Sequence, residues 1–470
     1  MLHMRCSRSI TVTANLSLCL VMALMLAPSG LAIQPDDGSN TQVYLPLMQK
    51  PVVFHESTGV LDPSFSTDGW GVIPYDMANL GDALARQPDG KLVVAGQGYT
   101  PNYDFIVVRI TPEGSMDPSF AEDGILFTDF AGTDDYAHAV AVQPDGKIIA
   151  AGYAWDDLAV ARYNPDGSPD TGFSEDGKVR VDVTALDQGE ALALLPDGKI
   201  LLVGSGSDSW EDPVDFILVR LNPDGSLDET FDEDGKLRID VSGEGDYAWA
   251  AALQTDGKLV VVGDASSDFL LARFNQDGSL DPSLNGKGWV FINLYISDDK
   301  GMAAVIQPDD KLVLAGTVNF GSGVDVGLAR YNWNGTLDMS FDGDGMLVTA
   351  VNSFDEAVHA LLYQADGSLV VAGAVNNGVN DDFAALRYTS TGSLDPTFDI
   401  DGVAVFDYGL AADAAYAAVL LSDGKILLAG QAETGSSQDF ALLRINPDGS
   451  PDDTFGSGGW VVTDFNGRSE

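Results

Sequence analysis

The stretch Gln143–Ser168, QPDGKIIAAGYAWDDLAVARYNPDGS, carries two Asp-Gly turns, one on each side of a pair of apolar runs. Asp-Gly between apolar runs is the strongest short-range signal for a β-hairpin, because glycine tolerates the positive φ that the turn requires. The chain shows no helical period of useful length. The stretch therefore predicts antiparallel strands in an all-β protein.

This stretch belongs to a series of repeats. The phrase Leu61-Asp-Pro-Ser-Phe65 returns at Met116, and degenerate copies begin at Pro169, Leu227, Leu280, Leu337, Leu394 and Pro451, at intervals of 53 to 58 residues. Each unit holds four strand-like runs: one rich in alanine, one after a Pro-Asp-Gly-Lys type of turn, one ending in arginine, and one after Asp-Gly. Four short antiparallel strands repeated radially form a propeller blade. We predict one seven-bladed β-propeller over residues 61–466, with a solenoid as the alternative.

The run after Asp-Gly occurs once more often than the other three. Its first copy contains Pro74, which removes a ladder donor and suits only the edge of a sheet. Its last copy, residues 460–465, has no such defect. We therefore expect the last copy to be the outer strand of the seventh blade.

The repeat resembles the delta-60 repeat family. The residues that carry the resemblance are Asp117–Phe120, Gln143–Gly152 and Ala161–Asn164, and the similarity extends over residues 61 to about 465. The resemblance implies a propeller and implies no catalytic role. It supports the fold and leaves the function open.

One alanine recurs six residues before each turn aspartate, which predicts close backbone approach in the innermost strand. The residue before it differs in every unit. Such variation is not expected from packing alone, so we predict a ligand-binding ring at the channel mouth, with seven different packing contacts as the alternative. The alanines are Ala83, Ala139, Ala191, Ala250, Ala303, Ala360 and Ala417, and the variable ring is Asp82, His138, Glu190, Trp249, Met302, His359 and Tyr416. The sequence does not require the histidines of the second and sixth blades to meet.

A position three residues before the variable ring is acidic in six of seven units. Clustered carboxylates raise each other's pKa or recruit a cation such as Ca²⁺. The alternative is that each acid caps its own turn. The candidate metal ligands are Asp135, Asp187, Asp246, Asp299, Glu356 and Asp413. The word Asp-x-Asp-Gly at 232–235, 342–345 and 399–402 lacks the rest of a calcium loop, so we interpret it as a turn.

An arginine also recurs once per unit and an aspartate precedes it by five residues. Both faces of a propeller strand are covered by other blades, so a guanidinium there must be hydrogen-bonded. We predict a structural ion pair in each blade, with a partner outside the arginine's own strand. The arginines are Arg109, Arg162, Arg220, Arg273, Arg330, Arg387 and Arg444.

The first 32 residues are typical of a signal peptide: Arg5 and Arg8 precede the apolar run 16–26, and a small-residue cleavage site follows at 30–32. Both cysteines lie in this segment. Residues 33–60 are interpreted as a linker. We expect export, no later transmembrane segment and a monomer.

The charge and the missing motifs narrow the function. A net charge of −47 argues against nucleic acid as a partner. No catalytic motif occurs, so no catalytic residue is assigned. The favoured function is a secreted, non-catalytic binding or scaffold module with a protein or glycan ligand. The alternative is a hydrolase or lyase acting on saccharides or lactones with a divalent cation, which should bring unlike residues together in one place.

Overall fold

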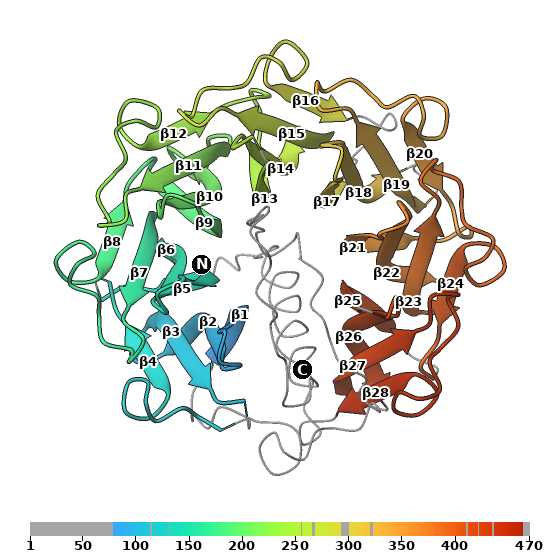
Figure 1. Cartoon of the computed structure of the whole chain (residues 1–470), viewed down its shortest axis with the longest axis horizontal. Coiled ribbons are helices and arrows are strands. Elements are labelled where there is room, and N and C mark those ends of the chain that lie inside the picture. The colour runs from blue at the N-terminus through green and yellow to red at the C-terminus, as the bar shows by residue number, and fades with distance from the viewer. Residues whose placement is uncertain are drawn as a thin grey trace, which may run out of the picture.

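The computed structural model describes residues 79–463, apart from 113–114, 131, 255, 266–267, 293–299, 320–322, 410–411, 422 and 435–436. These residues form 28 strands in seven four-stranded antiparallel sheets, and each sheet uses its strands in chain order. The sheets are the blades of a ring (Figure 1). The predicted all-β, seven-bladed propeller is therefore confirmed. The predicted signal peptide (1–32), the linker (33–60) and the first copy of the Asp-Gly strand lie outside the described residues.

The first strand of each blade is the innermost one, as the alanine pattern predicts (Figure 1). These strands are β1 (Asn79–Arg86), β5 (Asp135–Val142), β9 (Leu186–Leu194), β13 (Asp246–Leu253), β17 (Lys300–Ile306), β21 (Glu356–Tyr363) and β25 (Asp413–Leu420). The second strands are β2 (Leu92–Tyr99), β6 (Ile148–Ala154), β10 (Ile200–Ser207), β14 (Leu259–Ala265), β18 (Leu312–Asn319), β22 (Leu369–Asn376) and β26 (Ile426–Thr434).

The two outer strands complete each blade. The third strands are β3 (Tyr103–Ile110), β7 (Asp157–Tyr163), β11 (Asp215–Leu221), β15 (Asp268–Phe274), β19 (Val324–Tyr331), β23 (Asp381–Tyr388) and β27 (Ser437–Ile445). The fourth strands are β4 (Ile125–Thr128), β8 (Lys178–Val181), β12 (Lys236–Ile239), β16 (Trp289–Ile292), β20 (Met346–Thr349), β24 (Val403–Phe406) and β28 (Trp460–Thr463). The last copy of the Asp-Gly strand is thus the outer strand of blade 7, paired with β27.

The hydrophobic core lies between the blades, because each blade is covered on both faces by its neighbours. On β2, Val93 packs toward blade 2 in a cluster with Ile148, whereas Val94 packs toward blade 7 in a cluster with Leu427. This two-sided burial explains why the second strands are continuous apolar runs. In the described residues, side-chain packing between blades 7 and 1 closes the ring.

Each innermost strand carries a β-bulge at the residue before the recurring alanine. In β5, Ala137 pairs with Gly152 and Ala139 with Ala151, so His138 is the inserted residue. The bulge places the Tyr136 carbonyl oxygen only 2.0 Å from where a Cβ on Gly152 would lie. Glycine is therefore required in the second strand, which accounts for the repeated Ala-Gly word.

Candidate functional site

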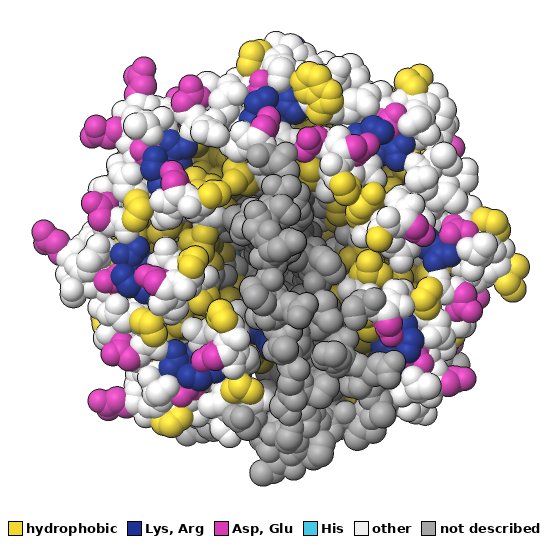
Figure 2. Space-filling model, viewed as in Figure 1, with side chains coloured by type: hydrophobic (Ala, Val, Ile, Leu, Met, Phe, Trp, Pro, Cys, Tyr) yellow, Lys and Arg dark blue, Asp and Glu magenta, His cyan; other side chains and the backbone are white. Residues whose placement is uncertain are grey.

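The two ends of the propeller carry different connections. We call the end that bears the turns after the innermost strands and the links after the third strands, such as 87–91 and 111–124, the clamp face. The opposite end, with segments such as 100–102 and 129–134, is the loop face. Figure 2 shows the clamp face, where Lys and Arg side chains lie beside Asp and Glu in patches around the ring.

The recurring arginines lie at the clamp face and are buried. Arg109 pairs through Nε with Asp117 at 2.7 Å, donates to the carbonyl oxygen of Pro165 in the next blade, and lies 4.8 Å from the ring centroid of Phe120. The acidic partners, eight residues after each arginine, are Asp117, Asp170, Asp228, Asp281, Asp338, Asp395 and Asp452, at 2.5–2.8 Å. The arrangement makes the guanidinium a clamp between neighbouring blades.

These acidic partners were not predicted from the sequence, although the phrase that marks each repeat contains them. The aspartate five residues before each arginine is not the partner. That aspartate lies at the other end of the same strand, at the loop face: Gly98 pairs with Asp104 and Val93 with Arg109 along β2 and β3.

The variable ring coincides with the bulge residues of the innermost strands. The bulge falls in mid-strand in every blade. An inserted residue is not held by the ladder on its own strand, so its side chain can differ from blade to blade. The side chain of Trp249 lies outside the described residues.

Three adjacent bulge residues form an acid–histidine–acid group across blades 1 to 3. His138 Nδ1 lies 3.6 Å from Glu190 Oε2, and both side chains are about one-fifth exposed. Burial opposes protonation of His138, but Glu190 and then Asp82 outweigh it and raise the His138 pKa. Burial also raises the pKa of Asp82. The buried atom Asp82 Oδ2 has no hydrogen-bond partner among the described residues, whereas the partner of His138 Nδ1 is Glu190.

Met302, His359 and Tyr416 make apolar or aromatic contacts. Met302 packs against the core cluster between blades 5 and 6. His359 lies edge-on to Tyr416, with ring centroids 5.1 Å apart, and burial lowers the His359 pKa to about 4. The structure therefore places the two histidines of the ring in different groups, and His359 is neutral at physiological pH.

A row of aromatic rings that the sequence analysis missed leads to His138 across the loop face. Centroid distances are 5.4 Å for Tyr99–Tyr103, 5.8 Å for Tyr103–Tyr136, 5.0 Å for Tyr136–Tyr153 and 5.4 Å for Tyr153–His138. We call these four tyrosines the tyrosine strip. Tyr99 pairs with Tyr103 within blade 1 and Tyr136 with Tyr153 within blade 2, so the docking of the blades joins the two pairs through Tyr103 and Tyr136.

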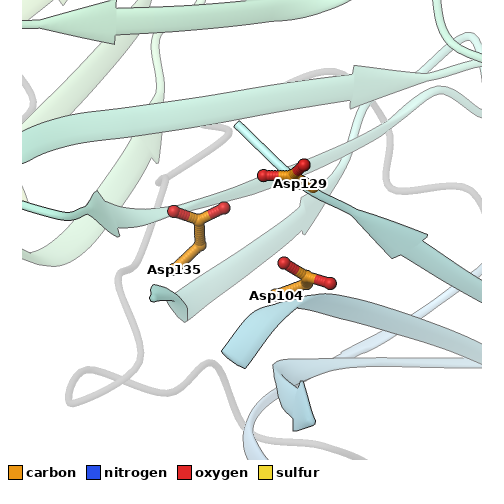
Figure 3. Close-up of side chains that lie close together, drawn as sticks. All are labelled: Asp104, Asp129 and Asp135. Carbon is orange, nitrogen blue, oxygen red and sulfur yellow. The ribbon is translucent and has the colours of Figure 1, made fainter. Parts of the chain in front are cut away.

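The recurring acids of the innermost strands lie at the junctions between blades. In Figure 3, Asp135 of β5 faces Asp104 of β3 and Asp129, which follows β4. The carboxylate oxygens of such triplets lie within 4.8 Å of one another, and each triplet takes two residues from one blade and one from the next. The triplets are Asp104, Asp129 and Asp135; Asp157, Asp182 and Asp187; Asp215, Asp240 and Asp246; and Asp382, Asp407 and Asp413.

The third acid of each triplet, at the start of the innermost strand, also caps the preceding loop. Asp135 Oδ2 accepts a hydrogen bond from the Phe130 amide at 2.8 Å, and Asp413 Oδ2 accepts one from the Tyr408 amide at 2.7 Å. Burial nevertheless raises the pKa of Asp135, Asp187 and Asp413 to about 6. Turn capping and charge clustering, posed as alternatives from the sequence, thus occur in the same residues.

Two triplets hold a cation supplied by the chain. Arg180 of β8 pairs with Asp157 at the junction of blades 2 and 3. Arg238 of β12 pairs through Nε with Asp215 at 2.6 Å at the junction of blades 3 and 4. At the junctions of blades 1 with 2 and 6 with 7, the corresponding residues are Phe127 and Val405. These two junctions have the carboxylates without the arginine.

At one further junction, one of the three acids is replaced by a neutral residue. Between blades 5 and 6, Ala350 takes the place of Asp129, which leaves Asp325 and Glu356. Burial, and then the neighbouring Asp325 carboxylate, raises the Glu356 pKa to about 7, so this pair holds a proton near neutrality. Asp299, the remaining metal candidate, lies outside the described residues. The words at 232–235, 342–345 and 399–402 are turns, as expected.

One family matches the chain in each blade. It is described as "Domain of unknown function (DUF5122) beta-propeller", and it matches residues 87–120, 143–173, 195–231, 254–284, 307–341, 364–398 and 421–455. The chain belongs to this family. Each matched segment runs from the turn after the innermost strand through the clamp and excludes the bulge residue. No curated protein matches the chain by sequence.

Several solved structures resemble the chain at low identity. A streptogramin B lyase is 12% identical with a TM-score of 0.38, covering 82% of this chain and 94% of its own. The Chaetomium thermophilum protein Sqt1, bound to the N-terminus of ribosomal protein L10, is 12% identical with a TM-score of 0.46, covering 81% and 86%. An ulvan lyase of polysaccharide lyase family PL25 is 9% identical with a TM-score of 0.43, covering 79% and 94%. These likenesses concern the fold alone. Among the described residues, no helix is long and apolar enough to cross a membrane.

Proposed function

We propose that the protein is a secreted, non-catalytic propeller that binds a ligand on the loop face over blades 1 to 3. The observation that carries the proposal is the Asp82–His138–Glu190 group, which exists at one place in a sevenfold repeat. Its buried Asp82 Oδ2 has no hydrogen-bond partner among the described residues, and native structures normally satisfy such an atom with water or a ligand. The clamp face, by contrast, uses its arginines to hold the blades together.

The enzymatic alternative is favoured by one observation. Unlike residues converge at His138, which is the property expected of a hydrolase or lyase rather than of a uniform scaffold. A histidine between two carboxylates can transfer protons. We place the binding module first because the sequence around these three residues contains no catalytic motif.

Binding and turnover can be separated with one set of variants. Cell fractionation should first find the chain outside the cytoplasm. The purified protein is then applied to panels of immobilised oligosaccharides and peptides, and any bound probe is checked by mass spectrometry for cleavage. We expect binding without cleavage, reduced at least tenfold in the triple variant Asp82→Asn, His138→Gln, Glu190→Gln. Met302→Leu, at the same position in blade 5, is the matched control. Cleavage that the triple variant abolishes would establish the enzyme instead.

We also propose that Ca²⁺ binds at the junctions of blades 1 with 2 and 6 with 7. The support comes from a comparison of the junctions: at two other junctions, Arg180 or Arg238 pairs with one acid of the equivalent triplet. Oxygen ligands from three carboxylates suit Ca²⁺, and an ion there would offset the repulsion among buried acids. Its role would be to stabilise the ring.

Calcium titration by calorimetry tests this ion site. Asp129→Ala, which copies Ala350, should lower the number of bound ions by one. Arg180→Phe, which copies Phe127, should raise it by one. The wild-type midpoint of thermal unfolding should rise with Ca²⁺ and fall with chelator. Equal stoichiometry in all three proteins would refute calcium at the junctions.

A further inference from the structure

The tyrosine strip is a continuous contact between two blades. Tyr99 and Tyr103 face each other across the hairpin of blade 1, and Tyr136 and Tyr153 are paired on β5 and β6 of blade 2. Tyr136 and Tyr153 are stacked with an interplanar angle of 27°, whereas Tyr99 and Tyr103 meet edge-on at 73°. Tyr99 is 38% exposed and the other three are partly exposed. The rings therefore form part of the surface rather than a closed core.

The strip is bordered by acids. Tyr103 donates its amide to Asp134 Oδ1 at 3.0 Å, which joins the blade 1 hairpin to the loop before β5. At the inner end of the strip, Asp82 and Glu190 flank His138. The carboxylates that border the strip and the electron-rich faces of its tyrosine rings therefore both attract positive charge.

Such a surface selects for positive charge. A cation over a tyrosine ring is attracted by the ring quadrupole, and the attraction increases when water is excluded. Carboxylates nearby add to it, and a chain of net charge −47 attracts basic partners from a distance. An acidic ligand would be repelled, and a neutral saccharide would use the ring faces without using the acids.

We propose that the tyrosine strip binds the guanidinium or ammonium groups of a basic segment of another protein, an inference that rests on the proposed binding function. The side chain of the partner lies against Tyr136 and Tyr153, and its charge lies toward Asp82 and Glu190. The strip then determines which ligand the loop face accepts.

Calorimetric titration of the full chain with hexa-arginine, hexa-glutamate and cellohexaose tests the proposal. We expect hexa-arginine to bind and the other two not to bind. Tyr136→Leu and Tyr153→Leu should each weaken hexa-arginine binding at least tenfold, whereas Tyr136→Phe should retain it because the ring remains. Tyr247→Leu is the matched control, because Tyr247 is the second residue of β13 as Tyr136 is of β5. Thermal melts establish that each variant is folded.

The outcomes separate this inference from the proposed function. Equal hexa-arginine binding by wild type and both leucine variants would show attraction by net charge alone and overturn the inference. Cellohexaose binding that the leucine variants lose would overturn the ligand class and leave the binding function standing. Probes whose binding changes in neither the strip variants nor the Asp82, His138, Glu190 variant would overturn both.

Discussion

The clamp face and the loop face are built from the two ends of the same strands, yet they behave oppositely. At the clamp face, each blade repeats the arginine and its aspartate, and in blades 1 to 6 the arginine also donates a hydrogen bond to the next blade. At the loop face, equivalent positions carry histidine, methionine or tyrosine at the bulge, and arginine, phenylalanine or valine beside the acid triplets. The residues that repeat in every blade make the contacts that hold the ring together. The residues that differ between blades lie where a ligand or an ion can bind.

The physical reason lies in burial. A buried guanidinium must have its hydrogen bonds satisfied, so no blade can lose one partner without a large cost. Bulge residues are half-buried and unpaired in the ladder, and the links at the loop face range from two residues (155–156) to seven (208–214). Substitutions at the bulges and in these links therefore cost little stability, so these positions can carry residues that serve a function.

The largest expected effect comes from breaking a clamp. Arg273→Ala should lower the free energy of unfolding by about 3–5 kcal/mol, because it leaves buried Asp281 without its main cation. Lys258, which also contacts Asp281 at 3.1 Å but is partly exposed, is the control, and Lys258→Ala should cost about 1 kcal/mol or less. Denaturant unfolding measures both. An unchanged denaturation midpoint for Arg273→Ala would show that the clamp does not stabilise the fold.

The loop face should respond to pH in the opposite sense from the clamp face. The folded pKa of about 6 for Asp135, Asp187 and Asp413 exceeds the unfolded value, so the folded state binds more protons. Stability in chelator should therefore fall as pH rises from about 4 to about 6.5. The fall should be roughly 1 kcal/mol per carboxyl, because solvent screening at these half-exposed sites reduces the full value of the shift. Thermal melts across this range measure the fall.

The clamp aspartates should depend on pH in the opposite sense from the loop-face acids, and calcium should change the pH dependence of the loop face. The pKa of Asp281 is lowered to about 2: burial alone would raise it, but hydrogen bonds from Ser283, the salt bridge with Lys258 and the Arg273 charge outweigh that effect. Its contribution is present above the unfolded pKa and lost as pH falls toward 2. Calcium should restore stability at pH 7.5 more than at pH 5. A pH profile that is flat between 4 and 6.5 in chelator would contradict the burial of unneutralised acids.

The smallest expected effect concerns the phenylalanine side chain that packs against a clamp arginine. Phe231 lies 4.7 Å from Arg220, whereas blade 4 has Leu284 at this position. Phe231→Leu should therefore cost only about 1 kcal/mol, from reduced burial and the lost cation–π contact. Phe231→Ala should cost about 3–5 kcal/mol because it leaves a cavity. Equal losses for the two variants in denaturant unfolding would show that the aromatic ring itself is essential.

Part of the candidate site was predictable from the sequence. The variable residue before each alanine and the acid three residues earlier were both found by aligning the repeats. The glycine opposite each bulge was visible in the Ala-Gly word, and it could have indicated the bulge. The Asp117 type of clamp partner was present in the phrase that defines the repeat, but a spacing of eight residues across a link does not reveal a contact.

The sequence by itself determined the all-β class, the number of blades and the innermost strand, because turn chemistry and strand periodicity are local and are written once in every repeat. Only the tertiary structure decided that Asp135 meets Asp104 and Asp129, that Tyr103 meets Tyr136, and that His138 meets Glu190. Each of these contacts joins strands that share no backbone ladder. They depend on how one blade packs against the next, which no spacing within a single repeat encodes.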